Sequence, residues 1–193
     1  MSLPPSTRDP WADVTSVRGF RCDELVSALQ KYIRRGNLEE TLLVAREMYE
    51  TSPDLEAHLW NRLMVISACD CNDGTFQQTL IVESLHRVGM RMQRGTGERW
   101  LFIAQAVRYL VAFPKDETTD EICMWSRHTM NNQLRSPVIP DYALDIHTEA
   151  GRKMGRGMAH FLDEGTVIAN QYSGADPTFG ERVREIVSRG EWG

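Results

Sequence analysis

The sequence predicts an all-α protein: a single helical-bundle domain followed by an irregular, glycine-rich C-terminal segment. Three observations support this fold class. The stretch from Trp100 to Lys115 is apolar on almost every side, and a helix of this kind must be covered by other elements on most of its faces. Further segments with helical periodicity follow one another with short breaks. No segment alternates apolar and polar residues for long, so a sheet is not indicated.

The apolar stretch is expected to be the central helix of the domain. Only Gln105 and Arg108 interrupt it, and it is too short to span a bilayer, which needs about 20 apolar residues. Pro114 cannot donate a backbone hydrogen bond and disfavours helical geometry at Phe113. The helix should therefore end at this point.

The chain before the central helix predicts four helices. Residues 1–18 are expected to be a flexible lead-in, because Pro4, Pro5 and Pro10 oppose a helix. A first helix should cover 23–35 and stop at Gly36. Asn37 is expected to cap the second helix and Ser52, followed by a proline, the third, which should run to about residue 68. After a polar turn over residues 69–74, a fourth helix is expected over 75–92, with Phe76, Leu80, Leu85 and Val88 facing inward.

The chain after the central helix predicts one clear helix and then weaker ones. A helix starting at Thr118 or Thr119 should carry Ile122, Trp125 and His128 and end by residue 133. Further helices are expected over 142–153 and 181–189, within a loop-like, glycine-rich region. Of the tryptophans, three are expected in the core: Trp60, Trp100 and Trp125.

Composition indicates an ordinary globular protein. The net charge of −5 argues against a coat protein for nucleic acid but leaves a local basic patch possible. The four cysteines are scattered, and the first ten residues are polar and contain prolines. Free thiols in a reducing cytoplasm are therefore expected.

Four pieces, in order along the chain, carry a resemblance. They are Leu25-Val-Ser-Ala-Leu-Gln-Lys-Tyr-Ile-Arg34; Arg62-Leu-Met64 with Ser67; Ala104-Gln-Ala-Val-Arg-Tyr-Leu-Val-Ala-Phe-Pro-Lys115; and Gly155-Arg-Gly157 with Ala169-Asn-Gln-Tyr172. In this order they resemble the C-terminal helical domain of the MgsA or RarA type of replication-associated AAA+ ATPases, relatives of the Werner-helicase-interacting protein. The match covers roughly residues 21–172.

The resemblance implies a helical domain related to the collar of clamp loaders, which assembles subunits into a ring or tetramer. The implied organisation is a helical domain over 19–172 and an extension with a short helix over 173–193. The chain has no Gly-x-x-x-x-Gly-Lys-[Ser/Thr] run to hold a phosphate. The expectation is therefore a domain without its ATPase: no enzyme, no cofactor, no catalytic residue and no metal. It would form a homo-oligomer, with a tetramer expected, in DNA replication, repair or recombination.

Two alternative functions remain open from the residues. The first is contact with single-stranded or forked DNA, because cations cluster in two places, the second among glycines. The candidate residues are Arg87, Arg91, Arg94, Arg99, Arg152, Lys153 and Arg156. The second alternative is a small metal-dependent hydrolase centred on His147, with Asp141, Asp145 and Glu149 nearby; Asp145 and Glu149 would share a face if this region were helical. A calcium loop at Asp70–Gly74 is disfavoured because its spacing is wrong. The His147-Thr-Glu149 run resembles zinc deaminases, but no cysteine pair follows it.

Overall fold

The fold is all-helical, as the sequence predicts. The computed structural model describes residues 9–192, which contain helices, turns and two isolated β-bridges. The chain divides into two compact units, Met1–Leu134 and Arg135–Gly193. The helical domain predicted over 19–172 includes residues of both units.

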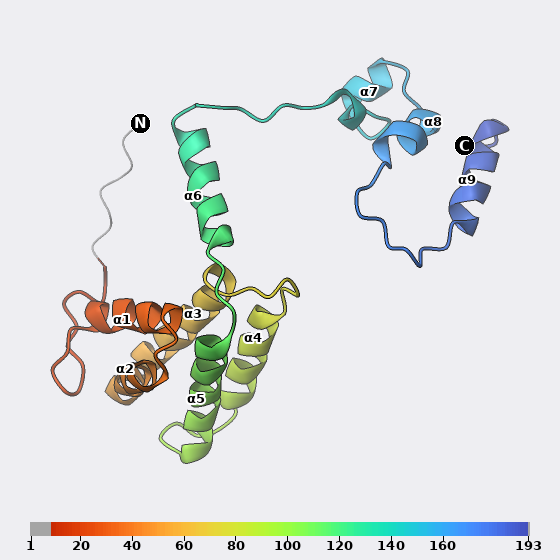
Figure 1. Ribbon diagram of the computed structural model, residues 1–193. Helices are drawn as coiled ribbons and strands as arrows, with labels where there is room; N and C mark the ends of the chain where they lie inside the picture. Colours follow the sequence, from red (N-terminus) through yellow and green to blue (C-terminus); the bar gives the residue numbers. More distant parts are fainter. Residues whose placement is uncertain (1–8, 193) are drawn as a thin grey trace. The chain divides into compact units, whose positions relative to one another are not determined.

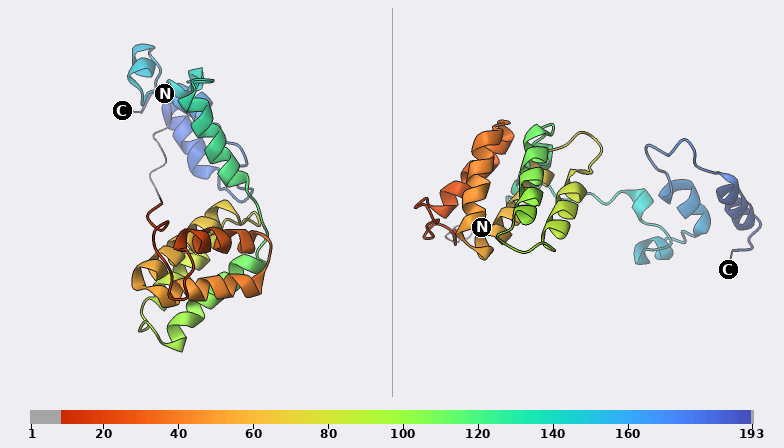
Figure 2. Two further views of the ribbon diagram at one scale, coloured as in Figure 1. Left: turned by 90° about the vertical axis from the view of Figure 1, so that its left-hand side faces the viewer. Right: turned by 90° about the horizontal axis from the view of Figure 1, so that it is seen from below.

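The first unit is a bundle followed by one further helix (Figures 1 and 2). α5 packs against each of the four helices that precede it, and α6 packs against α3. The central position of α5 is what the apolar stretch predicts. The elements are α1 (Cys22–Arg34), α2 (Leu38–Thr51), α3 (Pro53–Cys69), α4 (Gln78–Gly89), α5 (Gly97–Ala112) and α6 (Thr118–Asn131).

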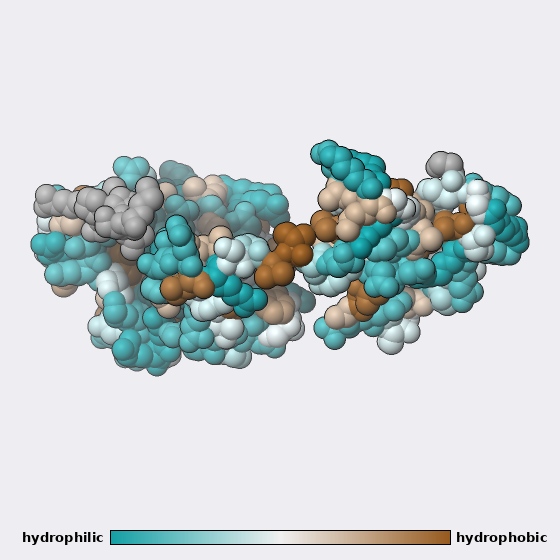
Figure 3. All heavy atoms as spheres, turned by 90° about the horizontal axis from the view of Figure 1, so that it is seen from above, coloured by the Kyte–Doolittle hydropathy of each residue, from teal (hydrophilic) through white to brown (hydrophobic). Residues whose placement is uncertain are grey.

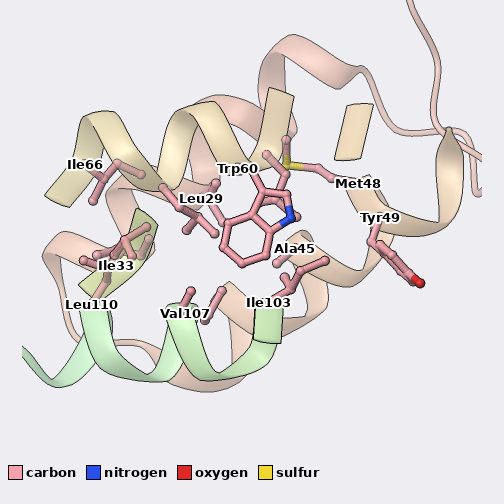
Figure 4. Packing of buried hydrophobic residues seen from close by; sticks show 14 of the residues in the cluster. Leu29, Ile33, Ala45, Met48, Tyr49, Trp60, Ile66, Ile103, Val107 and Leu110 are labelled. Carbon is pink, nitrogen blue, oxygen red and sulfur yellow. The ribbon is translucent and has the colours of Figure 1, made fainter. Parts of the chain in front are cut away.

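The core of this unit is built around Trp60, whose indole is 1% exposed. Figure 4 shows it between side chains from several helices. α5 contributes its buried face, Ile103, Ala106, Val107 and Leu110. Phe113 leaves the helix with φ −69° and ψ 148°, an extended conformation. This is the helix end that Pro114 predicts.

The predicted caps of the first helices are confirmed. Gly36 adopts φ +70°, and the amide of Asn37 donates to the carbonyl of Tyr32 across it (3.0 Å). The side chain of Asn37 then accepts from the amide of Glu40 (3.3 Å). Ser52 Oγ accepts from the amide of Leu55 (3.0 Å) at the start of α3. Local capping signals therefore set these boundaries.

The predicted inward face of the fourth helix is partly wrong. α4 begins at Gln78, so Phe76 lies before it in a left-handed turn (φ +57°) and is exposed, as is Leu80. Val82 is the side chain of α4 that is fully buried. At Gly89, a Cβ atom would lie 2.8 Å from Cβ of Phe102. This close approach of α4 and α5, rather than the apolar period alone, decides which face of α4 is covered.

Residues 9–21 form a tight turn that is fixed to α2. Thr15 and Arg21 pair as an isolated bridge, and Glu47 accepts from the backbone amide of Arg18 (2.9 Å) and from its guanidinium (2.5 Å). The remainder of the predicted flexible lead-in, residues 1–8, lies outside the described residues.

The second unit contains short helical elements. The predicted helix over 142–153 is interrupted, because residues 142–143 belong to a 3-10 helix, residues 149–153 are α-helical and Asp145 lies in the bend between them. Gly151 explains the break: a Cβ there would lie 1.9 Å from the carbonyl oxygen of Asp145, so the two backbones touch. The elements are η1 (Asp141–Ala143), α7 (Glu149–Lys153), α8 (Met158–His160), η2 (Phe161–Gly165) and α9 (Thr178–Ser188).

Candidate assembly surface

Helix α6 has little cover within the first unit. Its contacts with other helices there are to α3, and Figure 1 shows it projecting from the end of the bundle. The side chain of Asp120 is half-buried, and its charge acts on Cys69 at the end of α3. At 100° per residue, Asp120 lies across the helix from Ile122 and Trp125. Ile122 and Trp125 are therefore turned away from α3.

The apolar side chains of this face are exposed. Trp125 was expected in the core, and that prediction is wrong: it is 61% exposed. The reason is that the bundle core is already filled by α1 to α5, which leaves α6 a contact with one helix. We define the α6 face as four exposed apolar side chains, Ile122, Trp125 and Met130 on the helix and Leu134 in the turn that closes it.

The α6 face is large enough to be an interface. Its four side chains together expose on the order of 500 Å², spread over a broad sector of the helix because Met130 lies 140° from Trp125 around the axis; the largest apolar patch on a typical monomer is about 300–600 Å². Figure 3 shows hydrophobic, brown residues at several separate places on the molecular surface. Two such faces in contact would bury about 1,000 Å², the lower bound for a biological interface.

Helix stability supports the same conclusion. A helix of 14 residues is marginal in water by itself and gains most of its stability from the packing of an apolar face. Gln133 adopts φ +52°, and beyond it the amide of Leu134 donates to the carbonyl of Thr129 (3.0 Å). This closes α6 in the turn that usually takes glycine. The helix is thus terminated locally, but α3 covers only one side of it and its exposed apolar side chains have no partner among the described residues.

Among the cysteines, Cys123 on α6 is the exposed one. Burial raises the pKa of Cys69 to about 12 and that of Cys71 to about 11, and it also raises the pKa of Cys22. These three thiols are therefore held protonated at neutral pH. Cys123 is the natural chemical reporter for α6.

Two of the predicted phosphate contacts serve the fold instead. Glu56 is buried in α3, and its carboxylate accepts from Nε of Arg94 (2.9 Å) and from Nε of Arg99 (2.6 Å). Arg94 also donates to the carbonyl of Tyr49, and Arg99 to that of Met92 (3.0 Å). We call these three charged residues the Glu56 clamp. It fixes the turn between α4 and α5 to α3, so its arginines have few donors left for a ligand.

The side chains of Arg87 and Arg91 remain exposed, and neither makes a hydrogen bond or an ion pair within residues 9–192. The surrounding charge does not reinforce them. The first unit has 15 Lys and Arg against 18 Asp and Glu, a net charge of −3. The second has 7 against 9, a net charge of −2. Neither unit is a basic module of the kind that binds nucleic acid through its overall charge.

The second cation cluster is also partly used by the fold. Arg156 donates to the carbonyls of Asp141 (2.7 Å) and Leu144 (2.8 Å) and makes a two-pronged ion pair with the Asp141 carboxylate. Arg152 donates to the carbonyl of Ile146 (3.0 Å), and Lys153 pairs with Glu149 at 2.5 Å on an exposed surface. Arg152 and Lys153 are the accessible members of this cluster.

His147 lies beside one carboxylate rather than in a group of ligands. Its Nδ1 is 3.2 Å from Asp145, and its ring meets that of Phe161 edge-on at 4.7 Å between centroids. Hydrogen bonds from the backbone and side chain of His147 lower the pKa of Asp145. Asp141 and Glu149 are paired with Arg156 and Lys153 instead. Within the described residues, no three His, Cys, Asp or Glu side chains come together as metal ligands.

Two features of the structure could not be found from the sequence: the role of Glu56 and the exposure of the α6 face. Glu56 gave no signal, because a single acid on a helix resembles any solvated residue. The exposure of the α6 face was also missed, because Ile122 and Trp125 have the spacing of a core-facing helix.

No protein-family model matches the chain, and no curated protein matches it significantly. No helix in residues 9–192 is long and apolar enough to cross a membrane.

Proposed function

We propose that this chain is a non-catalytic assembly domain of a replication- or recombination-associated AAA+ ATPase system. Copies of the chain would associate through the α6 face. The observation that carries the proposal is the uncovered apolar face of α6. The ATPase context is supported by the ordered sequence pieces that resemble the MgsA or RarA C-terminal domain and by the missing phosphate-binding loop. A homo-oligomer, expected to be a tetramer, follows from that resemblance.

The magnitude of the α6 contact decides how tight the assembly can be. Complete burial of a large apolar side chain is worth about 1.5–3 kcal/mol, and these side chains are already partly covered. Four from each copy therefore contribute roughly 8–12 kcal/mol, against an association cost of about 4–15 kcal/mol. The α6 face alone supports a contact of micromolar strength at best. Because an isologous contact joins two subunits, a tetramer requires a second contact surface.

The test is the mass of the chain in solution, measured by size-exclusion chromatography with light scattering across the micromolar range. The wild-type chain should exceed the monomer mass of 22.1 kDa. The double variant Ile122→Glu/Trp125→Glu should run as a monomer with unchanged helicity, because both side chains are exposed. Leu80→Glu is the matched control: it places a charge on an equally exposed position of α4 and should leave the mass unaltered. A wild-type monomer at several hundred micromolar would refute the proposal, and so would an oligomer that the double variant retains.

Direct DNA contact is a second candidate, favoured by the unpaired Arg87 and Arg91. If these side chains and Arg152 hold phosphates, affinity for single-stranded or forked DNA should fall steeply with salt. The double variant Arg87→Gln/Arg91→Gln should then reduce the salt slope by about two. Absence of binding at low salt would exclude this function.

A further inference from the structure

A hollow in the first unit is lined by residues of α1, of α2 and of the turn before α1, and by none of the α6 face. It encloses about 530 Å³. Its apolar side chains come from both helices and from the turn that precedes α1: Phe20, Leu25, Ala28, Tyr32, Leu43 and Val44. We call it the α1–α2 groove.

The edge of the groove is held rigid by a polar network. Phe20 stands in the tight turn before α1 and is exposed. Its amide donates to Oγ of Ser16 (3.0 Å), and its carbonyl accepts from the amide of Ser16 (2.8 Å). Glu47 fixes the same turn by binding Arg18. An apolar ring is therefore presented to solvent in a preformed position, which lowers the entropy cost of binding.

The charge on the rim is negative once the internal ion pairs are counted. Arg18 is paired with Glu47 and Glu50, and Arg46 with Glu50 (2.6 Å), so both cations of the rim are neutralised. The guanidinium of Arg46 also stacks on the ring of Trp100 at 4.8 Å.

The carboxylates of the rim have fewer ion-pair partners than its arginines. Glu40 has no ion pair within the described residues, and the nearest cation to Glu24 is Arg21 at 3.7 Å. A ligand that fits the groove should therefore combine an apolar surface with a positive charge.

We propose that the α1–α2 groove binds a short amphipathic helix from another protein, with a lysine or arginine beside its apolar face. Apolar helices commonly dock into grooves of this kind through side chains at i, i+3, i+4 and i+7. The α6 face of a second copy is a poor occupant, because Glu121, which lies 40° from Trp125 around that helix, would meet the negative rim. The groove and the α6 face are separate surfaces, so this inference does not depend on the proposed assembly.

The experiment uses a fluorescein-labelled designed helix of about 18 residues, with leucines at i, i+3, i+4 and i+7 and two flanking lysines. A second peptide has glutamates in place of the lysines. Fluorescence anisotropy with the full chain should show the basic peptide binding at least tenfold more tightly than the acidic one. Leu43→Asp should weaken binding of the basic peptide at least tenfold, because Leu43 lines the groove and is 65% exposed. Glu40→Lys should narrow or reverse the preference between the two peptides.

Leu101→Asp is the control, since Leu101 is equally exposed on α5 but does not line the groove. It should bind the basic peptide as the wild type does. The inference fails if the wild-type chain shows no saturable binding up to about 1 mM, or if Leu43→Asp binds as tightly as Leu101→Asp. Light scattering of the same variants completes the test: if Leu43→Asp alone converts an oligomer into a monomer, a second copy occupies the groove and the inference is overturned.

Discussion

Replacing Glu56 with glutamine should destabilise the first unit, although the substitution hardly changes side-chain volume. Glu56 is buried and holds Arg94 and Arg99 through hydrogen bonds of 2.9 and 2.6 Å. Breaking a buried ion pair by removing one partner costs about 3–5 kcal/mol. The side chain of Arg99 is 11% exposed, and that of Arg94 is 33% exposed and partly solvated. We therefore expect Glu56→Gln to lower the free energy of unfolding by about 3 kcal/mol.

The assay is urea unfolding followed by tryptophan fluorescence, which reports on the first unit because four of the five tryptophans lie there. A loss of about 3 kcal/mol should also lower the Tm of a unit of this size by roughly 10 °C. Glu83→Gln is the control: Glu83 is half exposed and 3.8 Å from His86, so its removal should cost less than about 0.5 kcal/mol. A change below about 1 kcal/mol for Glu56→Gln would refute the clamp. Arg94 and Arg99 would then again be candidates for phosphate contact.

Three further predictions follow from single positions. Burial, with a contribution from the charge of Arg62, lowers the pKa of His58 in the folded state. The free energy of unfolding should therefore be at its full value above about pH 6.5 and decrease as the pH falls below it, because the unfolded chain takes up the proton more readily. Urea unfolding at a series of pH values should show this decrease in His128→Gln but not in His58→Gln. Maleimide at pH 7 should label Cys123 before any other thiol, because Cys123 is exposed while the other cysteines are more buried and burial raises the pKa of their thiols. Mass spectrometry that finds the Cys123→Ser variant labelled as quickly as the wild type would contradict this. Gln133→Gly should raise the free energy of unfolding by about 0.5–1 kcal/mol, because Gln133 has a positive φ, which glycine adopts without strain. Asn132→Gly should not raise it, because Asn132 has φ −96°. Urea unfolding of the two variants compares these free energies.

The helix boundaries were predictable wherever a local signal sets them. Gly36, Asn37, Ser52 and Pro114 each act on backbone groups within a few residues, and each helix end lies where those residues place it. The central place of α5 was predictable for a similar reason. A helix that is apolar on nearly every side leaves few alternatives to burial.

The candidate surface was not predictable in the same way. The spacing of Ile122 and Trp125 is the spacing of any core-facing helix, and nothing in it says whether a neighbour exists. The same holds for the arginines between residues 87 and 99. The four arginines look alike in the sequence. Glu56, some forty residues earlier, forms ion pairs with Arg94 and Arg99, whereas Arg87 and Arg91 remain in solvent.

The sequence by itself therefore determined an all-helical chain, the ends of its first helices and the helix at the centre of its core, because caps, breakers and an all-round apolar surface act locally. Only the tertiary structure decided which apolar faces are covered and which charges are neutralised. Burial and ion pairing depend on residues distant in the chain, and in this protein they leave α6 with an uncovered face and turn Arg94 and Arg99 into parts of the fold.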